Sequence, residues 1–293
     1  MRSLPRRVPS RRRHIRRHRP PRRRPAPVRD AQEAAPPRAA PGDRLRGRTR
    51  VVFVSGEHDT PGHLYRVVRP AAAAALVGAE TDWMRPDEIL RRLDEVRAAD
   101  VLWIWRASWG DGIAAAVEEA RGAGARVVFD VDDLMVDPGL ARCDVIDGIR
   151  TQDLTEDMVR DHYSRIRATM AAADLCLAPT EELAAHMRQA GVPARVLPNG
   201  FDHDTFATSR LAARRRAVEP PDRLVRIGYA GGSRTHQRDF ALCANAVAAA
   251  LRARPECRLV AFRSPDGTRA ILDVEEFPAF RGLEDRIEWR NFV

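Results

Sequence analysis

The sequence contains few cysteines and no long apolar run. Its four cysteines form no Cys-x-x-Cys pair and have no histidine at metal-ligand spacing, so we expect reduced thiols and neither disulfides nor a zinc site. No apolar stretch approaches the roughly 18 residues that span a membrane, and the basic start has no apolar segment of the kind found in a secretory signal. We therefore expect a cytoplasmic protein, free or peripheral to the inner face of the membrane. The cysteines are Cys143, Cys176, Cys243 and Cys257.

Positive charge is concentrated at the start of the chain. Residues 1–50 contain 18 Arg and three acidic residues, a balance of +15, so the rest of this +9 chain carries −6. Because its Pro and like charges cannot bury enough apolar surface to offset ordering, we expect the Arg/Pro-rich tail at residues 1–49 to be disordered. Clustered Arg could bind anionic lipid or nucleic acid. A solvated extension is the simpler interpretation, and nucleic acid is the least favoured partner.

From residue 50 onward, short apolar runs alternate with segments of helical periodicity. "RVVFVS", "VLWIW" and "RVVFD" are such runs, and this alternation predicts parallel strands joined by right-handed crossovers. We predict an α/β fold with two Rossmann-like domains, residues 50–206 and 225–293, joined by an Arg-rich linker at 207–224. Ligands of such sheets bind beyond the carboxyl ends of the strands, so the loops there are the candidate sites.

One long segment resembles a known enzyme family. "ADLCLAPTEELAAHMRQAGVPARVLPNGFDHDTF" contains a strand, Thr-Glu, a helix, Gly-x-Pro, a strand and Pro-Asn-Gly-x-Asp, in the order found in family 4 (group 1) GT-B glycosyltransferases. "VVFVSGEHDTPGHLYRVVRP" is similar to the first strand and acceptor-side loop of a bacterial branch. The resemblance covers roughly residues 50–293. It implies a GT-B-like fold and a hexosyltransferase-like enzyme without a cofactor, which moves a sugar with retention from a nucleotide-diphosphate sugar to a hydroxyl of a sugar, lipid or protein.

The Pro-Asn-Gly-x-Asp loop has a physical role beside the resemblance. Asn199-Gly200 is a favoured pair for positive φ, and Asp202 can cap the turn or the helix that follows at Asp204. We expect this loop to direct the chain toward a cleft between the domains. A purely structural turn is the alternative interpretation.

The donor site is expected in the second domain, in "RIGYAGGSRTHQRDF". Glycines after a strand let the backbone approach phosphate, and the N-terminus of the following helix favours anions. The family often has G-R-L-x-x-x-K-G here, and the resemblance places Ser233 at the Arg position and Arg238 at the Lys position. Arg234 would replace the missing charge. The donor-binding candidates are Gly231, Gly232, Ser233, Arg234, His236 and Arg238.

Acidic residues in "FDVDDL" are the catalytic candidates. Many family members have a His in this loop, which is absent here, so Asp130, Asp132 or Asp133 would orient or deprotonate the acceptor hydroxyl. Helix capping by these residues is an alternative. Asp-x-Asp is also typical of the metal-dependent GT-A class, but two Rossmann-like halves argue against it, and we predict no metal site. The acceptor-binding candidates, which could instead pack the helix, are Glu57, Tyr65 and Arg66.

The second domain is expected to be incomplete. A family member would continue beyond residue 293 with a Glu-x7-Glu motif and a crossing C-terminal helix. Two alternatives to an active transferase therefore remain: a non-catalytic fragment of one, or a binder of anionic lipid or nucleic acid through the tail. The nucleotide base, the sugar and the acceptor are left open.

Overall fold

The computed structural model describes residues 48–220 and 222–291. Almost all of the tail predicted at residues 1–49 therefore lies outside the described residues. Within the described part of the chain, no helix is long and apolar enough to cross a membrane.

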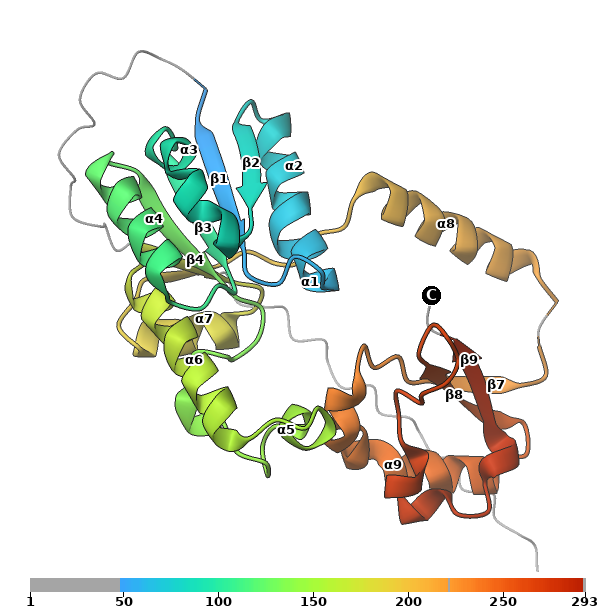
Figure 1. The fold of residues 1–293 in the computed structure, drawn as a ribbon. Coiled ribbons are helices and arrows are strands. Elements are labelled where there is room, and N and C mark those ends of the chain that lie inside the picture. The colour runs from blue at the N-terminus through green and yellow to red at the C-terminus, as the bar shows by residue number, and fades with distance from the viewer. Residues whose placement is uncertain (1–47, 221, 292–293) are drawn as a thin grey trace, which may run out of the picture. The chain divides into compact units, whose positions relative to one another are not determined.

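The larger sheet has six parallel strands in the order β2-β1-β3-β4-β5-β6 (Figure 1). Five of these strands, all but β2, were predicted from apolar runs in the sequence. The edge strand β2 was not predicted, because its sequence ETDWM is largely polar and only Met84 is fully buried. The strands are β1 Arg50–Ser55, β2 Glu80–Met84, β3 Val101–Trp105, β4 Arg126–Asp130, β5 Leu175–Ala178 and β6 Ala194–Val196.

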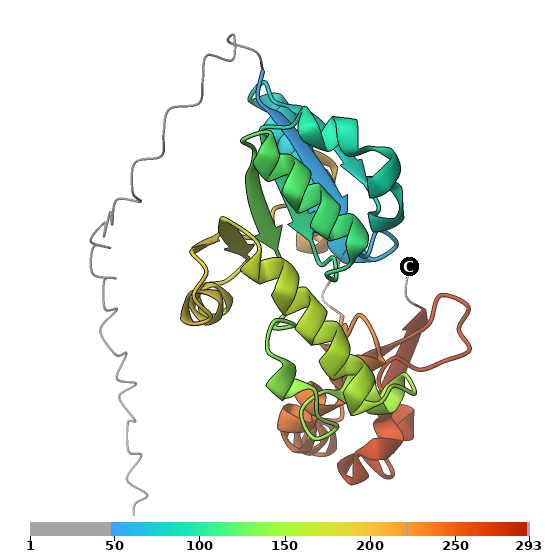
Figure 2. The same cartoon turned by 60° about the vertical axis from the view of Figure 1, so that its left-hand side comes forward.

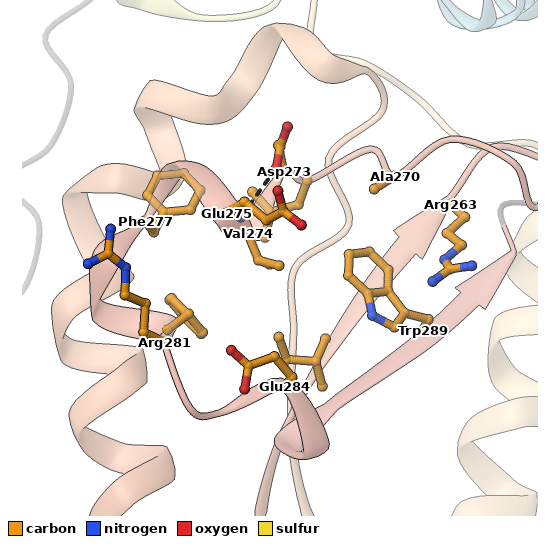
Figure 3. A pocket seen from close by; sticks show the side chains of 12 residues that line it. Arg263, Ala270, Asp273, Val274, Glu275, Phe277, Arg281, Glu284 and Trp289 are labelled. Atoms are coloured by element: carbon orange, nitrogen blue, oxygen red, sulfur yellow. Dashed lines mark hydrogen bonds between the residues drawn. The ribbon is translucent and has the colours of Figure 1, made fainter.

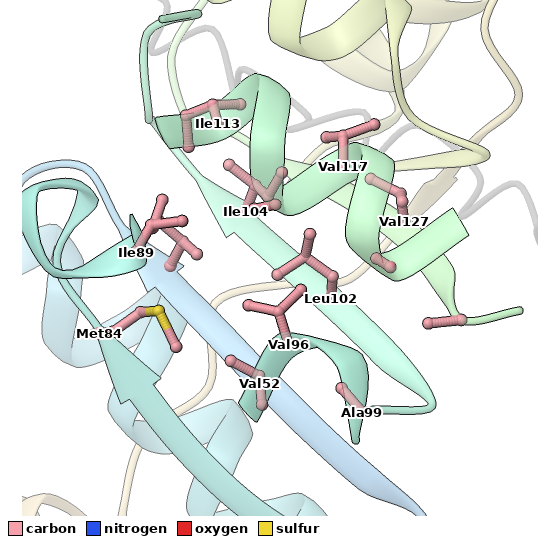
Figure 4. Close-up of a cluster of buried hydrophobic side chains, with 14 of the residues drawn as sticks. Val52, Met84, Ile89, Val96, Ala99, Leu102, Ile104, Ile113, Val117 and Val127 are labelled. Carbon is pink, nitrogen blue, oxygen red and sulfur yellow. The ribbon is translucent and has the colours of Figure 1, made fainter. Parts of the chain in front are cut away.

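Helices pack on both faces of this sheet. Helices lie on both sides of the strands (Figure 2). Alternate residues of β1 point to opposite faces: Val52 packs with α3 and α4 (Figure 4), whereas Phe53 packs with the helix that starts at Pro61. That helix continues through a π-helical turn, and Pro70 lies in the first turn of its last part, where a missing N–H costs little. The helical segments are α1 Pro61–His63, η1 Leu64–Val68, α2 Arg69–Leu76, η2 Pro86–Arg91, α3 Leu93–Arg97, α4 Asp111–Gly122, η3 Pro138–Leu140, α5 Asp147–Thr151, α6 Glu156–Ala171 and α7 Glu181–Gln189.

The smaller sheet has three parallel strands in the order β7-β8-β9. Helix α9 buries Phe240, Ala244, Ala248 and Leu251 against the core that includes Leu259 of β8. The predicted α/β class with two parallel sheets, the second smaller, is confirmed. The strands of the smaller sheet and the helical segments around it are β7 Val225–Gly228, η4 Arg234–His236, α9 Gln237–Ala253, β8 Cys257–Arg263, η5 Val274–Glu276, η6 Pro278–Phe280, η7 Glu284–Arg286 and β9 Ile287–Asn291.

Helix α8 (His203–Val218) occupies most of the predicted linker at 207–224. None of its residues is buried, so its stability depends on its own hydrogen bonds and its cap. Asp202 is that cap, because its Oδ1 accepts a hydrogen bond of 2.6 Å from the backbone N–H of Thr205. The capping role expected from the sequence is confirmed.

The end of β1 lies unusually close to the end of β3, and this approach requires glycine. A Cβ atom at Gly56 would lie 2.2 Å from the carbonyl oxygen of Arg106. We expect Gly56→Ala to lower the free energy of unfolding by about 1–3 kcal/mol, because the backbone must move to relieve the overlap. Urea unfolding measures the change.

Gly122→Ala is the matched control for this substitution. Gly122 ends α4 with open space around its Cα, so alanine there should be neutral or stabilise by roughly 0.5–1 kcal/mol. Equal unfolding midpoints for the two variants would contradict the close approach at Gly56.

Candidate functional site

Charged side chains from three loops meet at the carboxyl edge of the larger sheet. Glu57 follows β1, Arg106 follows β3, and Asp132 and Asp133 follow β4. Arg106 donates from Nη1 to Glu57 Oε2 (2.9 Å) and from Nε to Asp132 Oδ1 (2.9 Å), and its Nη2 pairs with Asp133. The structure therefore brings three of the predicted site residues together around one arginine.

Arg106 is rigidly held, and it was not predicted from the sequence. Its φ of 48° is uncommon for a residue with a side chain, and its guanidinium lies 5.6 Å from the centre of the Trp105 ring. Burial lowers the pKa of Arg106, but Asp132, Asp133 and Glu57 outweigh burial and raise it overall, so the guanidinium stays charged. Its position directly after the buried run VLWIW was the signal that could have identified it.

A serine–histidine pair lies beside this cluster. The Oγ of Ser108 is 3.0 Å from Nδ1 of His162, which α6 presents half-buried. Burial lowers the pKa of His162; Glu57 acts in the opposite direction and Arg106 adds to the lowering. The imidazole is therefore mostly neutral near pH 7 and able to accept a proton. Neither residue was predicted from the sequence, because α6 contributes His162 from far along the chain.

Asp130 and Arg66 form a buried ion pair. Arg66 donates to Asp130 Oδ1 from Nη2 (2.7 Å) and Nε (3.0 Å), and Trp103 Nε1 donates to Oδ2 (3.0 Å). Burial raises the pKa of Asp130 to about 7, although Arg66 and Trp103 act to lower it. Both residues are fully buried. Because they have no surface for an acceptor, we assign Asp130 and Arg66 a structural role in place of the predicted catalytic and acceptor contacts.

Two arginines of the first helix hold the Pro-Asn-Gly-x-Asp loop. Arg66 Nη1 donates to Leu197 O (2.7 Å) and to Asn199 Oδ1 (3.1 Å), and Arg69 Nη1 donates to Gly200 O (2.8 Å). The predicted positive φ at Asn199 and Gly200 is wrong: neither residue adopts it. Side-chain hydrogen bonds from outside the loop, not a left-handed backbone, stabilise its shape.

The loop ends at Asp202, a part-exposed acidic cap. The backbone N–H of Thr205, the Thr205 hydroxyl and the Arg69 guanidinium lower the pKa of Asp202 to about 2. Arg69 also lies over the ring of Tyr65 at 5.6 Å, and Tyr65 is half-buried. Tyr65 therefore packs the helix, as the alternative interpretation expected, and keeps part of its surface exposed.

The predicted donor loop, which follows β7 of the smaller sheet, borders a hollow. The hollow has a volume of about 310 Å³ and lies where β7 ends. A Cβ atom at Gly232 would meet nothing within 4 Å, whereas one at Gly231 would lie 3.3 Å from the Tyr229 ring. The lining residues are Gly228, Tyr229, Ala230, Gly231, Gly232 and His236.

The other predicted donor residues have protein partners. Ser233 caps the turn η4. Arg234 donates to Ala270 O (2.9 Å) and pairs with Asp273 (3.2 Å). Arg238 donates to Asp147 Oδ1 (3.1 Å) and Cys143 O (2.8 Å).

His236 has a carboxylate partner, and the cysteines are unpaired with one another. His236 Nδ1 lies 2.8 Å from Asp239 Oδ2. The four cysteines are free thiols, of which Cys176 and Cys257 are buried. Among residues 48–220 and 222–291, no three His, Cys, Asp or Glu side chains are grouped so as to hold a metal ion.

No protein-family model and no curated protein matches the chain. Similar solved structures include an α-glucosyltransferase in complex with UDP-glucose and DNA containing an abasic site, at 12% identity and a TM-score of 0.39; the match covers 82% of this chain and 60% of that one. A UDP-N-acetylglucosamine 2-epimerase from Rickettsia bellii matches at 10% identity and a TM-score of 0.36, over 83% and 69% of the two chains. TM-scores this low carry no argument about the function of this chain.

The buried ion pair predicts a large effect of one arginine on stability. Arg66→Met leaves the Asp130 carboxyl buried without its cation, so we expect unfolding free energy to fall by about 3–5 kcal/mol. Chemical denaturation monitored by circular dichroism measures it. Arg69→Met, one helical turn away and paired with the part-exposed Asp202, should cause a much smaller loss. Similar losses for both variants would show that the buried pair contributes no more to stability than the part-exposed pair of Arg69 and Asp202.

Proposed function

We propose that this chain binds a nucleoside-diphosphate sugar and transfers the sugar to an acceptor hydroxyl. The observation that carries the proposal is the glycine-lined hollow at the end of β7, directly before η4 and α9. Open space beside Gly232 lets a phosphate approach the backbone, and the following helix favours negative charge at its start. Retention of anomeric configuration, as in the family that the sequence resembles, is part of this proposal.

The diphosphate would contact the backbone of Gly231 and Gly232, with Ser233 and His236 beside it. His236 lines the hollow, and its ring is exposed. Arg234 and Arg238 would join only after exchanging their present partners, Asp273 and Asp147. The proposed donor site therefore depends on backbone donors first and on arginines second.

The acceptor would bind at the carboxyl edge of the larger sheet. Asp133 is largely exposed, Glu57 is part-exposed, and Arg106 holds both in place. Carboxylates accept hydrogen bonds from hydroxyl groups, and a neutral His162 or a carboxylate could take the proton that the acceptor loses. Asp133 and His162 thereby replace Asp130 in the proposed chemistry.

Gly232→Ala tests the donor site without disturbing the protein. The new methyl group meets no protein atom within 4 Å, but it occupies the space that a phosphate would need. We expect affinity for a nucleoside diphosphate to fall about tenfold or more, because charge-assisted hydrogen bonds to phosphate are worth about 1.5–3 kcal/mol. Calorimetric titration with UDP, GDP and ADP measures the loss.

Gly122→Ala, in α4 and equally free of overlap, is the control and should bind as the wild type does, because Gly122 does not line the hollow. Unchanged nucleotide affinity in Gly232→Ala, with the fold intact by circular dichroism, would place the phosphates elsewhere.

A further inference from the structure

A second and larger cavity lies in the crossover between β8 and β9. Its volume is about 470 Å³, within the range of about 300–1,000 Å³ common for small-molecule pockets. The buried side chains of Phe277 and Phe280 contribute to its apolar lining, and Trp289 of β9 forms one side (Figure 3). Such a lining favours a flat, apolar ring, since an aromatic surface gains most from stacking on another planar group.

Acidic and basic side chains border the apolar lining of the cavity. Glu275, Glu284 and Arg281 border the cavity, and all three are exposed. The backbone N–H groups of Glu284 itself and of Gly282 lower the pKa of Glu284, so its carboxylate is charged near neutral pH. Among the described residues, neither Glu275 nor Arg281 forms an ion pair. The ligand should therefore carry hydrogen-bond donors and acceptors on the edge of its ring.

We propose that this cavity binds a guanine base. Guanine carries two adjacent donors, N1–H and the 2-amino group, which match the two oxygens of one carboxylate. It also carries two adjacent acceptors, O6 and N7, which an arginine fork contacts in a bidentate manner. The Arg263 guanidinium lies 5.0 Å from the centre of the Trp289 ring, so the base would stack on the face of Trp289 that Arg263 does not cover. Adenine and uracil each lack the pair of adjacent donors, so the carboxylates favour guanine over both.

The cavity adjoins the glycine hollow through one short segment. A Cβ at Gly231 would lie 3.8 Å from Cγ2 of Ile271, and the residues on either side, Ala270 and Leu272, line the larger cavity. The base can come from a free nucleoside or from a guanosine diphosphate whose phosphates reach Gly232. Only the second source rests on the proposed function; the base pocket itself does not.

Nucleosides without phosphate test the base pocket alone. We expect the full chain to bind guanosine at least about tenfold more tightly than adenosine or uridine in calorimetric titrations, since one bidentate contact discriminates by about that factor. Inosine, which lacks only the 2-amino group, should also bind more weakly than guanosine. Equal affinities, or no binding of guanosine, would overturn the proposal.

Paired substitutions show which carboxylates accept hydrogen bonds from the base. The double variant Glu275→Gln and Glu284→Gln should lose the preference for guanosine over inosine, while Glu276→Gln should keep it. Glu276 is the matched control because it pairs with Arg150 and does not line this cavity. A preference that survives the double variant, or that Glu276→Gln also removes, would refute the assignment.

GDP separates this inference from the proposed function. If both hold, GDP binds more tightly than guanosine, and Gly232→Ala removes that gain without weakening guanosine. Guanosine binding with no gain from the phosphates would support the base pocket and remove the donor site. If GDP binds in a way that depends on Gly232 but guanosine does not bind, the donor site is supported and the base pocket is removed.

Discussion

The buried pair of Arg66 and Asp130 is the interaction on which the carboxyl edge of the larger sheet depends. One guanidinium joins the end of β4 to the first helix and to the carbonyl of Leu197 after β6. Burying two charges is expensive unless each is paired and hydrogen-bonded, and Trp103 supplies the remaining donor to the carboxylate. Removing either partner would leave the other charge without compensation, so the loop after β6 and the end of β4 are stabilised together.

Around that anchor, a second arginine holds charged groups that lie closer to solvent. Arg106 gathers Glu57, Asp132 and Asp133 from neighbouring strand ends, and Gly56 permits the close backbone approach that places them. Of the three aspartates at the end of β4 and just after it, Asp130 is buried and structural, whereas Asp132 and Asp133 lie closer to solvent. Three carboxylates with similar sequence signals receive different roles because they differ in burial.

The smaller sheet has a different arrangement, with two hollows on either side of one segment. The glycine loop after β7 is open at Gly232, and Ile271 separates it from the cavity that contains Trp289. Arg234 fastens that segment by its bonds to Ala270 and Asp273. Arg234, which the sequence suggests as a phosphate ligand, stabilises this segment in the structure, as an arginine can do with its five donors.

Local patterns in the sequence were sufficient for the α/β class, for all strands of the larger sheet but β2, and for the cap at Asp202, because each depends on neighbouring residues. They also placed the candidate chemistry at strand ends, since parallel strands share one carboxyl edge. Only the tertiary structure decided that Asp130 is buried, that Arg238 pairs with Asp147, that Arg106 pairs with Glu57, and that His162 contacts Ser108. Burial and charge pairing join residues far apart along the chain, and no local periodicity specifies which of many arginines meets which carboxylate.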